Sequence, residues 1–566
     1  MKPKHSYGAV AVWCVMFFAF APSLCAQEAT APGHEGVPLD WSQHHIVFSR
    51  NALAQHPDLM YREPRVLHQV MERWQPPNWG VFQDADPQLV STKRSGPKRD
   101  WNFSLGSGRL GPHVFPAKFS FDPASPPDCV NDYVVFGMSI PGTTGGQANL
   151  VAFNNLYVDS SGLGICPGTA PNVMFAYNIT TAGGKIVTSP ILSLDGKKIG
   201  FVESVPGATP SAIFHVLTWT AGQGTITAAA APPASPAFTS TIFSPVANST
   251  SSSPWIDFGN DIVYLGADNG NVYKITGVFK GTPTLSGFPW PVLTGTNVRL
   301  SPPVLDSILG LLMVGGSNGD LYQIDTATAT VVATLPVGSG GTSSGVYAPP
   351  IVDITNGTTF VVSANAGASL GVGAVLVEAD TATLGTVPPL AVAQIGVGSS
   401  GGTALRLYEP AFSNDYFNNP STGIITLCGT GTTTGDTSPW QYAFGFTGNT
   451  INTASPFSRQ LITSTAAHCT GWTEFFNPNL GLPIGTDFFF FGLSQDCTTP
   501  GGGIPAGCVA EISGGSGTAL PLFVTVPGGS SGIVVDNYSL GLGASSIYLS
   551  AEGFDTAYKF TQNGLN

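Results

Sequence analysis

The sequence predicts an all-β chain built from repeated units, and two observations lead to that prediction. Segments 254–275 and 303–324 align over 22 residues without a gap, at an offset of 49 positions. The composition is that of strands joined by many turns: Gly and Pro form about a fifth of the 566 residues, 42% are hydrophobic and only 10% are charged. β-Branched residues suit a pleated strand, whereas Gly and Pro mark turns.

The two copies are identical at seven positions that a hairpin-rich unit needs. These positions are Pro254/Pro303, Asp257/Asp306, Gly266/Gly315, Asn269/Asn318, Gly270/Gly319, Tyr273/Tyr322 and Ile275/Ile324. An Asn-Gly pair accepts the positive φ angles of a tight hairpin. Asp257, Asp306 and the equivalent Asp353 are expected to end a strand by bonding to their own turn backbone.

Weaker copies extend the repeat in both directions. Counting from the shared Pro, units begin near residues 116, 190, 254, 303, 350, 410, 473 and 532. Four short antiparallel strands per unit, repeated in this way, are typical of a β-propeller. We predict eight blades, with seven as the alternative. The last unit has room for about three strands, so segment 101–105 is expected to supply the fourth and close the ring.

Residues 27–100 fit neither pattern and are expected to form an N-terminal arm or linker before a propeller over 101–566. A short amphipathic helix is predicted there from Pro64 to Trp74, because Val66, Leu67 and Val70 recur at helical spacing before Pro76-Pro77.

The charge is unevenly placed along the chain. The net charge is −13, and residues 121–566 contain 9 Lys and Arg against 25 Asp and Glu. So acidic a body should repel nucleic acid and anionic lipid. The basic cluster Lys93, Arg94, Lys98 and Arg99 is interpreted as a solvated linker, with a docking patch for an acidic partner as the alternative.

The first 26 residues are interpreted as a cleaved signal peptide. Lys2 and Lys4 precede a short apolar run, and Ser23-Leu24-Cys25-Ala26 offers a cleavage site. Lipidation at Cys25 is an alternative, although Pro22 makes a poor lipobox. No later segment is long and uniformly apolar enough for a transmembrane helix. The mature protein is therefore expected to be secreted or periplasmic.

Six cysteines remain after this cleavage, and an even number in an exported chain favours disulfides. They are Cys129, Cys166, Cys428, Cys469, Cys497 and Cys508. Six cysteines allow 15 connectivities. Proximity favours joining Cys497 to Cys508 across a turn-forming insert, and then the two remaining pairs in sequence order.

The motifs VYLGADNGNVYKI and LLMVGGSNGDLYQIDTATATVV resemble the quinoprotein-like (PQQ-like) propeller repeat. The resemblance implies an eight-bladed propeller, in a superfamily that includes quinone-dependent dehydrogenases and non-catalytic scaffolds. Those dehydrogenases often use an adjacent-cysteine disulfide, a Glu/Asn/Asp calcium set and a catalytic Asp. This chain has no Cys-Cys pair and no matching set, so the resemblance implies the fold without the cofactor.

No residue set predicts catalysis or a resident metal. His44, His45, His56 and His68 fit no standard zinc spacing. His113, His215 and His468 stand apart from any recognisable nucleophile. The turns 268–271 and 317–320 carry oxygen atoms that suit calcium, but hairpin geometry already explains them. No cofactor is therefore predicted.

The leading functional hypothesis is an exported, non-catalytic scaffold that binds a protein or glycan partner through rim loops or the channel mouth. Two alternatives remain open. One is an extracellular enzyme, a quinone-dependent dehydrogenase, hydrolase or lyase, with its site in the central funnel. The other is a cell-surface structural protein whose arm docks a neighbour.

Overall fold

The structure is a computed structural model that describes residues 36–73, 96–111, 113–122, 127–158, 164–180, 183–341, 344–399, 406–478, 480, 485–499, 502–503, 506–536 and 544–561. The predicted signal peptide lies outside these residues, as do Cys25, Lys93 and Arg94. No helix among the described residues is long and apolar enough to cross a membrane.

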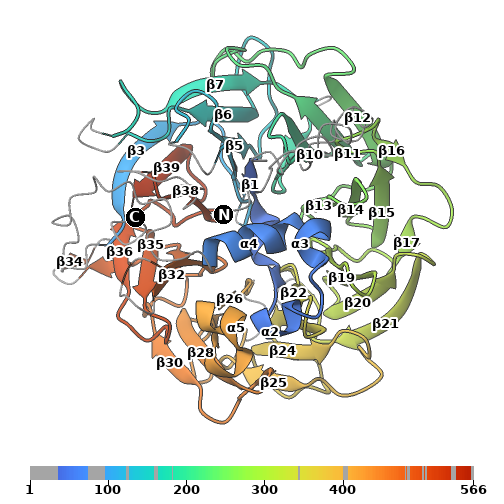
Figure 1. Cartoon of the computed structure of the whole chain (residues 1–566), viewed down its shortest axis with the longest axis vertical. Helices are drawn as coiled ribbons and strands as arrows, with labels where there is room; N and C mark the ends of the chain where they lie inside the picture. Colours follow the sequence, from blue (N-terminus) through green and yellow to red (C-terminus); the bar gives the residue numbers. More distant parts are fainter. Residues whose placement is uncertain are drawn as a thin grey trace, which may run out of the picture. The chain divides into compact units, whose positions relative to one another are not determined.

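The described strands form an eight-bladed β-propeller, with small antiparallel sheets arranged around a central channel (Figure 1). The innermost strands are β4 (Ala117–Ser120), β9 (Ile191–Leu192), β13 (Trp255–Asp257), β18 (Val304–Asp306), β22 (Ile351–Asp353), β26 (Ala411–Phe412), β31 (Thr473–Asn477) and β37 (Val534–Asp536). The second strands are β5 (Tyr133–Gly137), β10 (Lys198–Val205), β14 (Ile262–Gly266), β19 (Leu311–Gly315), β23 (Thr358–Ser363), β27 (Ile424–Gly429), β32 (Thr486–Leu493) and β38 (Ser546–Ser550).

The third and outer strands complete each blade. The third strands are β6 (Leu150–Asn154), β11 (Ser211–Thr218), β15 (Asn271–Thr276), β20 (Asp320–Asp325), β24 (Val375–Asp380), β28 (Trp440–Thr447), β35 (Cys508–Ser513) and β39 (Thr556–Thr561). The outer strands are β7 (Asn172–Tyr177), β12 (Phe238–Ser244), β16 (Thr284–Leu285), β17 (Val292–Leu293), β21 (Thr330–Pro336), β25 (Ala391–Gln394), β29 (Thr450–Ile451), β30 (Phe457–Gln460), β36 (Leu522–Thr525) and β3 (Lys98–Ser104). Two short additions are β8 (Lys185–Ile186) on β10 and the hairpin β33 (Thr498–Thr499)–β34 (Gly502–Gly503).

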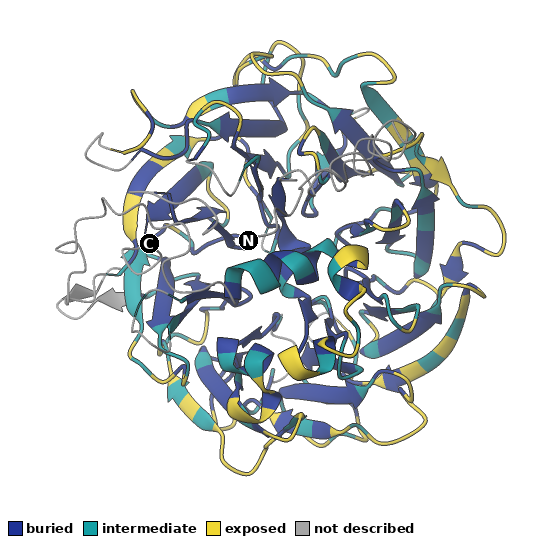
Figure 2. Cartoon of the chain, viewed as in Figure 1, coloured by how far each residue is buried: buried dark blue, intermediate teal, exposed yellow. Residues whose placement is uncertain are grey.

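Burial follows the position of a strand within its blade (Figure 2). Strands β5 and β23 are buried along their whole length, because neighbouring blades cover both faces. The outer strand β21 instead alternates between exposed and more buried residues over most of its length, since one face meets solvent. The continuous apolar runs of the sequence therefore belong to the inner part of the ring.

The ring is closed by a strand from the N-terminal part of the chain, as the strand count predicts. β3 pairs antiparallel with β39, with Ser104 opposite Thr556 and Lys98 opposite Thr561. Lys98 and Arg99 are exposed on this strand, so this part of the basic cluster belongs to a blade and not to a linker. Pairing both chain ends in one sheet removes the open edge of the ring.

The arm enters the channel. β1 (Val37–Leu39) pairs antiparallel with β4, and β2 (Ile46–Val47) pairs in parallel with β22 on another blade. Between them lies the 3-10 helix η1 (Trp41–His44), and after them come α2 (Arg50–Leu53), α3 (Leu59–Arg62) and α4 (Pro64–Arg73). These helices lie over the centre of the ring (Figure 1). Two further short helices, α5 (Asn414–Asn418) and η3 (Pro420–Thr422), belong to blade six.

Three disulfides join Cys129 to Cys166, Cys428 to Cys469, and Cys497 to Cys508. These are the pairs that sequence proximity favours. The second of them links β27 of one blade to the segment before β31 of the next.

We expect closure of the ring to depend on Trp101 of β3. Its side chain is buried, its Nε1–H donates to the carbonyl of Leu156 at 3.3 Å, and it packs against Phe153 and Tyr548. Trp101→Ala should lower the free energy of unfolding by about 3–5 kcal/mol, measured by urea titration. Asn102→Ala, an exposed position on the same strand, is the control and should cost less than about 0.5 kcal/mol. Equal effects of the two substitutions would contradict this role.

Candidate binding site at the channel mouth

The repeated aspartates mark one end of the channel. In Asp257, Asp306 and Asp353, a carboxylate oxygen accepts a hydrogen bond from a backbone N–H two or three residues later, at 2.9 Å from Ile308 in the case of Asp306. Each aspartate is the last residue of its innermost strand. The carboxylates thus hold the turns at the C-terminal ends of these strands.

The Asn-Gly turns lie between the second and third strands. Gly270 and Gly319 have φ angles of +85° and +93°, the conformation that the hairpin requires. The oxygen atoms considered for calcium already accept bonds: Asp268 Oδ1 accepts from the backbone N–H of Thr250 at 3.1 Å. Asn318 donates to the Asp320 carboxylate at 2.6 Å. Among the described residues, no group of three or more His, Cys, Asp or Glu is placed to hold a metal ion.

The helices of the arm cover the same end of the channel as the aspartates. Arg62 Nη2 donates to the carbonyl of Ser307, just after β18, at 2.8 Å. The backbone N–H of Ser49 donates to Thr355 Oγ1, just after β22, at 2.9 Å. We call segment 37–73 the helix cap.

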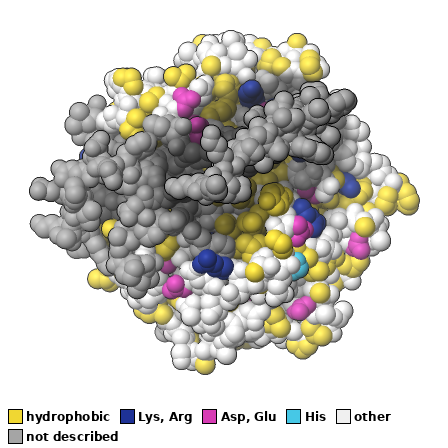
Figure 3. Space-filling view, viewed as in Figure 1, with side chains coloured by type: hydrophobic (Ala, Val, Ile, Leu, Met, Phe, Trp, Pro, Cys, Tyr) yellow, Lys and Arg dark blue, Asp and Glu magenta, His cyan; other side chains and the backbone are white. Residues whose placement is uncertain are grey.

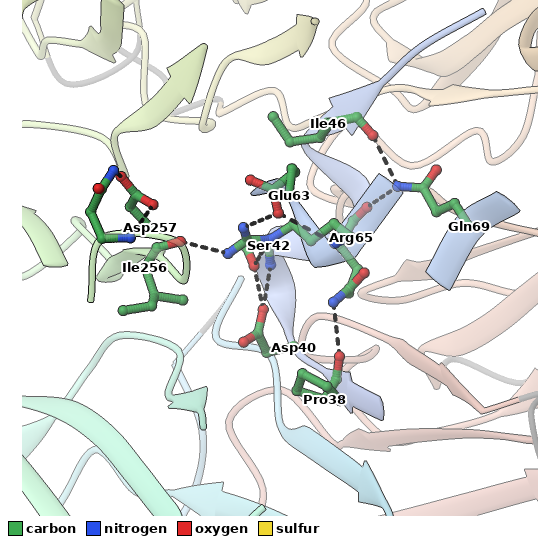
Figure 4. Close-up of polar contacts among 11 residues, drawn as sticks. Pro38, Asp40, Ser42, Ile46, Glu63, Arg65, Gln69, Ile256 and Asp257 are labelled. Atoms are coloured by element: carbon green, nitrogen blue, oxygen red, sulfur yellow. Dashed lines mark hydrogen bonds and ion pairs between the residues drawn. The ribbon is translucent and has the colours of Figure 1, made fainter. Parts of the chain in front are cut away.

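A buried arginine joins the helix cap to the ring (Figure 4). The Arg65 guanidinium donates to Glu63 at 2.7 Å, to Ser42 Oγ at 2.8 Å and to the carbonyl of Ile256 at 3.1 Å. Its Cζ also lies 4.2 Å from the ring centroid of Trp255. Burying a charge is costly unless hydrogen bonds and an opposite charge compensate for the lost water, and Arg65 receives both from the cap and a carbonyl bond from β13.

The histidines of the arm are packing residues of the helix cap. Burial is the main reason that the pKa falls to about 4 for His44, to about 3 for His45 and to about 4 for His68. They are therefore neutral at pH 7. His45 Nδ1 lies 2.8 Å from the carbonyl oxygen of Trp41, within the same turn of chain.

A small cavity of ≈50 Å³ lies between the helix cap and blades six to eight. Two of its charged groups pair with each other, because Arg73 Nη1 donates to Glu474 Oε1 at 2.9 Å and Arg73 Nη2 donates to Glu474 Oε2 at 2.5 Å. This bidentate pair stabilises the docking of α4 on blade seven.

The outer surface of the helix cap is apolar. Tyr61 is 84% exposed, and Pro64, Leu67, Val70 and Met71 are partly buried. Figure 3 shows apolar side chains gathered near the centre of this face, over α3 and α4.

The opposite mouth of the channel is lined by one equivalent residue from each blade. Each lies two positions before the innermost strand, and we call the set the mouth ring: Phe115, Ser189, Ser253, Pro302, Pro349, Glu409, Gly471 and Gly532. Six of them, 115 to 409, line a single cavity of ≈60 Å³ with Trp41 of the helix cap. Such a volume holds a few water molecules.

Consecutive members of the mouth ring touch. The backbone N–H of Phe115 donates to Ser189 Oγ, and that of Ser189 to Ser253 Oγ, both at 2.9 Å. On the far side, a Cβ added to Gly471 would overlap Oε1 of Glu409. The glycine therefore leaves the space that the carboxyl group fills.

Glu409 is the one ionisable member of the mouth ring, and its carboxyl group is unpaired. The residue is 2% exposed, and neither carboxylate oxygen has a hydrogen-bond partner among the described residues. Burial raises the pKa of Glu409 to about 7, against a small opposing effect of its own backbone N–H. A buried carboxyl group without a partner is unusual, because desolvation strongly disfavours its charge.

Other unpaired polar atoms line the same cavity. Thr188 Oγ1 and both ring nitrogens of His113 have no hydrogen-bond partner in the part of the chain that the structure describes. Burial, with smaller contributions from the charges of His468 and Arg406, holds the pKa of His113 well below its ordinary range. His113 stacks on Tyr408.

Two of the three histidines of the ring, His215 and His468, lie beside a carboxylate. His215 Nε2 lies 2.8 Å from a carboxylate oxygen of Glu203 inside blade two. His468 Nε2 lies 2.9 Å from a carboxylate oxygen of Glu552. Burial alone would lower the pKa of His468, but the hydrogen bond and the charge of Glu552 outweigh burial, so the pKa is raised. The first pair joins the adjacent strands β10 and β11, and the second joins two loops that are 84 residues apart in sequence.

Sequence reasoning did not single out Glu409 or Thr188. The sequence did contain one signal for Glu409. In the six units that begin with Pro, the residue before this Pro lines the cavity, and only before Pro410 is that residue charged.

Comparisons with known proteins show no family for this chain. No known protein-family model matches the sequence, and no curated protein matches it significantly. Among solved structures, BamB from Moraxella catarrhalis is 12% identical, with a TM-score of 0.42, over 81% of this chain and 98% of that one. The Dos1 propeller is 11% identical, with a TM-score of 0.46, over 82% and 95%. The WD40 domain of Toxoplasma gondii coronin is 14% identical, with a TM-score of 0.34, over 73% and 90%.

The Arg65 network predicts a contrast between two arginines of the arm. Arg65→Met should lower the free energy of unfolding by about 3 kcal/mol, because Glu63 would lose its cation in a buried place. Arg62→Met breaks an exposed pair with Asp58 and an exposed bond to the carbonyl of Ser307, and should change the free energy of unfolding by less than about 1 kcal/mol because both contacts lie in water. Urea titration of both variants measures the contrast; similar values would show that Arg65 does not anchor the cap.

The buried carboxyl groups predict that stability falls as pH rises. Burial raises the pKa of Glu378 from 4.5 to about 7, opposed by a bond from the Ile451 N–H. The folded state thus holds this proton more tightly, giving stability that is present below pH 4.5 and lost as pH rises through 7. In urea titrations, Glu378→Gln should reduce the loss of unfolding free energy between pH 4.5 and 8 by on the order of 3 kcal/mol. Asp325→Asn, an exposed control, should leave it unchanged; an unaltered slope in Glu378→Gln would refute the assignment.

Proposed function

We propose that this protein is an exported, non-catalytic β-propeller scaffold that binds a protein or glycan partner at the mouth ring. The observation that carries the proposal is the asymmetry of the channel. The helix cap docks at one end through two arginine–carboxylate pairs, whereas at the other end the Glu409 carboxyl, Thr188 hydroxyl and His113 ring have no hydrogen-bond partner among the described residues. Pockets with a few convergent polar groups among apolar walls are the usual form of a binding site.

Export is supported by the sequence and by the cysteines. The signal-like first 26 residues and six cysteines joined as three disulfides suit an oxidising compartment. Membership of the quinoprotein-like superfamily is part of the same proposal, and it rests on the two best repeat copies.

Aromatic residues border the open mouth. Tyr347 is partly exposed beside the cavity, and the Arg406 guanidinium lies 4.5 Å from its ring centroid. Tyr and Arg are the residue types that most often dominate binding energy at an interface. A partner seated on the mouth ring would therefore contact both side chains.

The test compares the same substitution at the two ends of the channel. Glycan and peptide arrays are probed with the wild-type protein, Tyr347→Ala and Tyr61→Ala. Tyr347→Ala should weaken the strongest binding by about tenfold or more, because it removes an aromatic wall of the mouth. Tyr61→Ala, on the helix cap, should retain it. Absence of wild-type binding, or equal loss in both variants, would overturn the proposal.

A further inference from the structure

Only one of the eight equivalent positions of the mouth ring carries an ionisable side chain. Across the eight equivalent residues, the side chains are one Phe, two Ser, two Pro, two Gly and Glu409. Both serine hydroxyl groups already accept backbone bonds within the ring. The Glu409 carboxyl, next to Gly471, is therefore the one charged group that the mouth ring itself contributes to the cavity, which Arg406 also lines.

The cavity around Glu409 is lined by a carboxyl group whose two oxygen atoms have no hydrogen-bond partner among the described residues, although Arg406 and the neutral His113 ring also offer donors to the same cavity. The carboxylate supplies two free oxygen atoms, and Thr188 Oγ1 adds a third oxygen. No cation among the described residues pairs with Glu409, because no cation lies within salt-bridge distance and none contributes to its pKa shift. Arg406 is turned to the ring of Tyr347. A ligand group that pairs with the Glu409 carboxylate must bring hydrogen-bond donors, and a positive charge strengthens those bonds.

We propose that Glu409 binds a primary alkylammonium group, such as the side chain of a lysine on a partner protein. An ammonium group has three donors and no acceptor, which complements the free oxygen atoms. The cavity of ≈60 Å³ suits an ammonium head on a narrow alkyl stem better than a sugar ring. The walls of Trp41 and Tyr408 suit such a stem, since lysine side chains pack their methylene groups on apolar surface. This inference rests on the proposed function and names the group that the mouth ring recognises.

The experiment compares a charged probe with a neutral probe of the same shape. Isothermal titration calorimetry at pH 8 measures n-butylamine, which is protonated, and 1-butanol, with glucosamine as a bulkier amine. The whole mature chain is used. Butylammonium should bind about tenfold or more tightly than butanol, because only the ammonium pairs with the carboxylate.

Two variants separate the site from the rest of the fold. Glu409→Gln should weaken butylammonium binding by about tenfold or more. Glu378→Gln replaces another buried carboxyl group whose pKa is also raised to about 7, in β24, and should bind as the wild type does. Gly471→Ala keeps the carboxyl group but crowds it, and should weaken binding as well. Thermal melts of each variant establish that the fold is retained.

Each other outcome overturns the inference. Equal binding of butanol and butylammonium would mean that charge is not recognised, and unchanged binding by Glu409→Gln would place the amine elsewhere. Binding of glucosamine without butylammonium would assign the site to amino sugars. If an array partner needs Tyr347 but tolerates Glu409→Gln, the proposed function stands and the ammonium inference fails. If no array partner needs Tyr347, the proposed function fails independently of the amine titration.

Discussion

Eight blades leave a central channel that the chain must fill, and most of the structure around that channel depends on how it is filled. Protein interiors are close-packed, so an empty channel of this kind would forfeit contacts along every innermost strand. The arm supplies the missing contacts: β1 and β2 extend two blades inward, and Trp41 and Arg65 lie between the sheets. Ring closure by β3 belongs to the same solution, because it fixes the chain that follows the helix cap to the last blade.

Filling the channel from one end makes the two mouths chemically different. At the helix cap, two buried arginines have carboxylate partners: Arg65 has Glu63, and Arg73 has Glu474. These pairs cross from the arm to the ring or hold the arm in shape, so they specify how the cap docks. At the mouth ring, Trp41 is the one residue of the described part of the arm that lines the cavity. Among the described residues, the Glu409 carboxyl group there has neither a cation nor a hydrogen-bond partner, whereas Arg65 and Arg73 of the helix cap are each paired with a carboxylate.

The sequence predicts the fold well because a repeat encodes local geometry. Asn269-Gly270, Asp306 and the strand before Gly315 act within their own unit, so their pattern suffices to place turns and strands. The site depends on contacts between units and could not be predicted in the same way. That His468 meets Glu552, or that Gly471 leaves room for Glu409, follows only from the order of blades around a closed ring. The path of the arm, which decides which mouth stays open, has no periodic signal at all.

The copies of a repeat separate what the fold requires from what it tolerates. At the mouth-ring position, serine, proline and glycine are compatible with the backbone, so an acidic side chain there is not demanded by blade geometry. Its burial carries a cost, because a carboxyl group removed from water without a cation is held near its neutral form. Sequences that break a local rule without gain to the fold do so mainly at functional sites. Glu409 is such an exception, because it is a buried carboxyl group without a cation in the cavity at the mouth ring. A bound cation would offset the desolvation of this carboxyl group, and that gain would contribute to affinity.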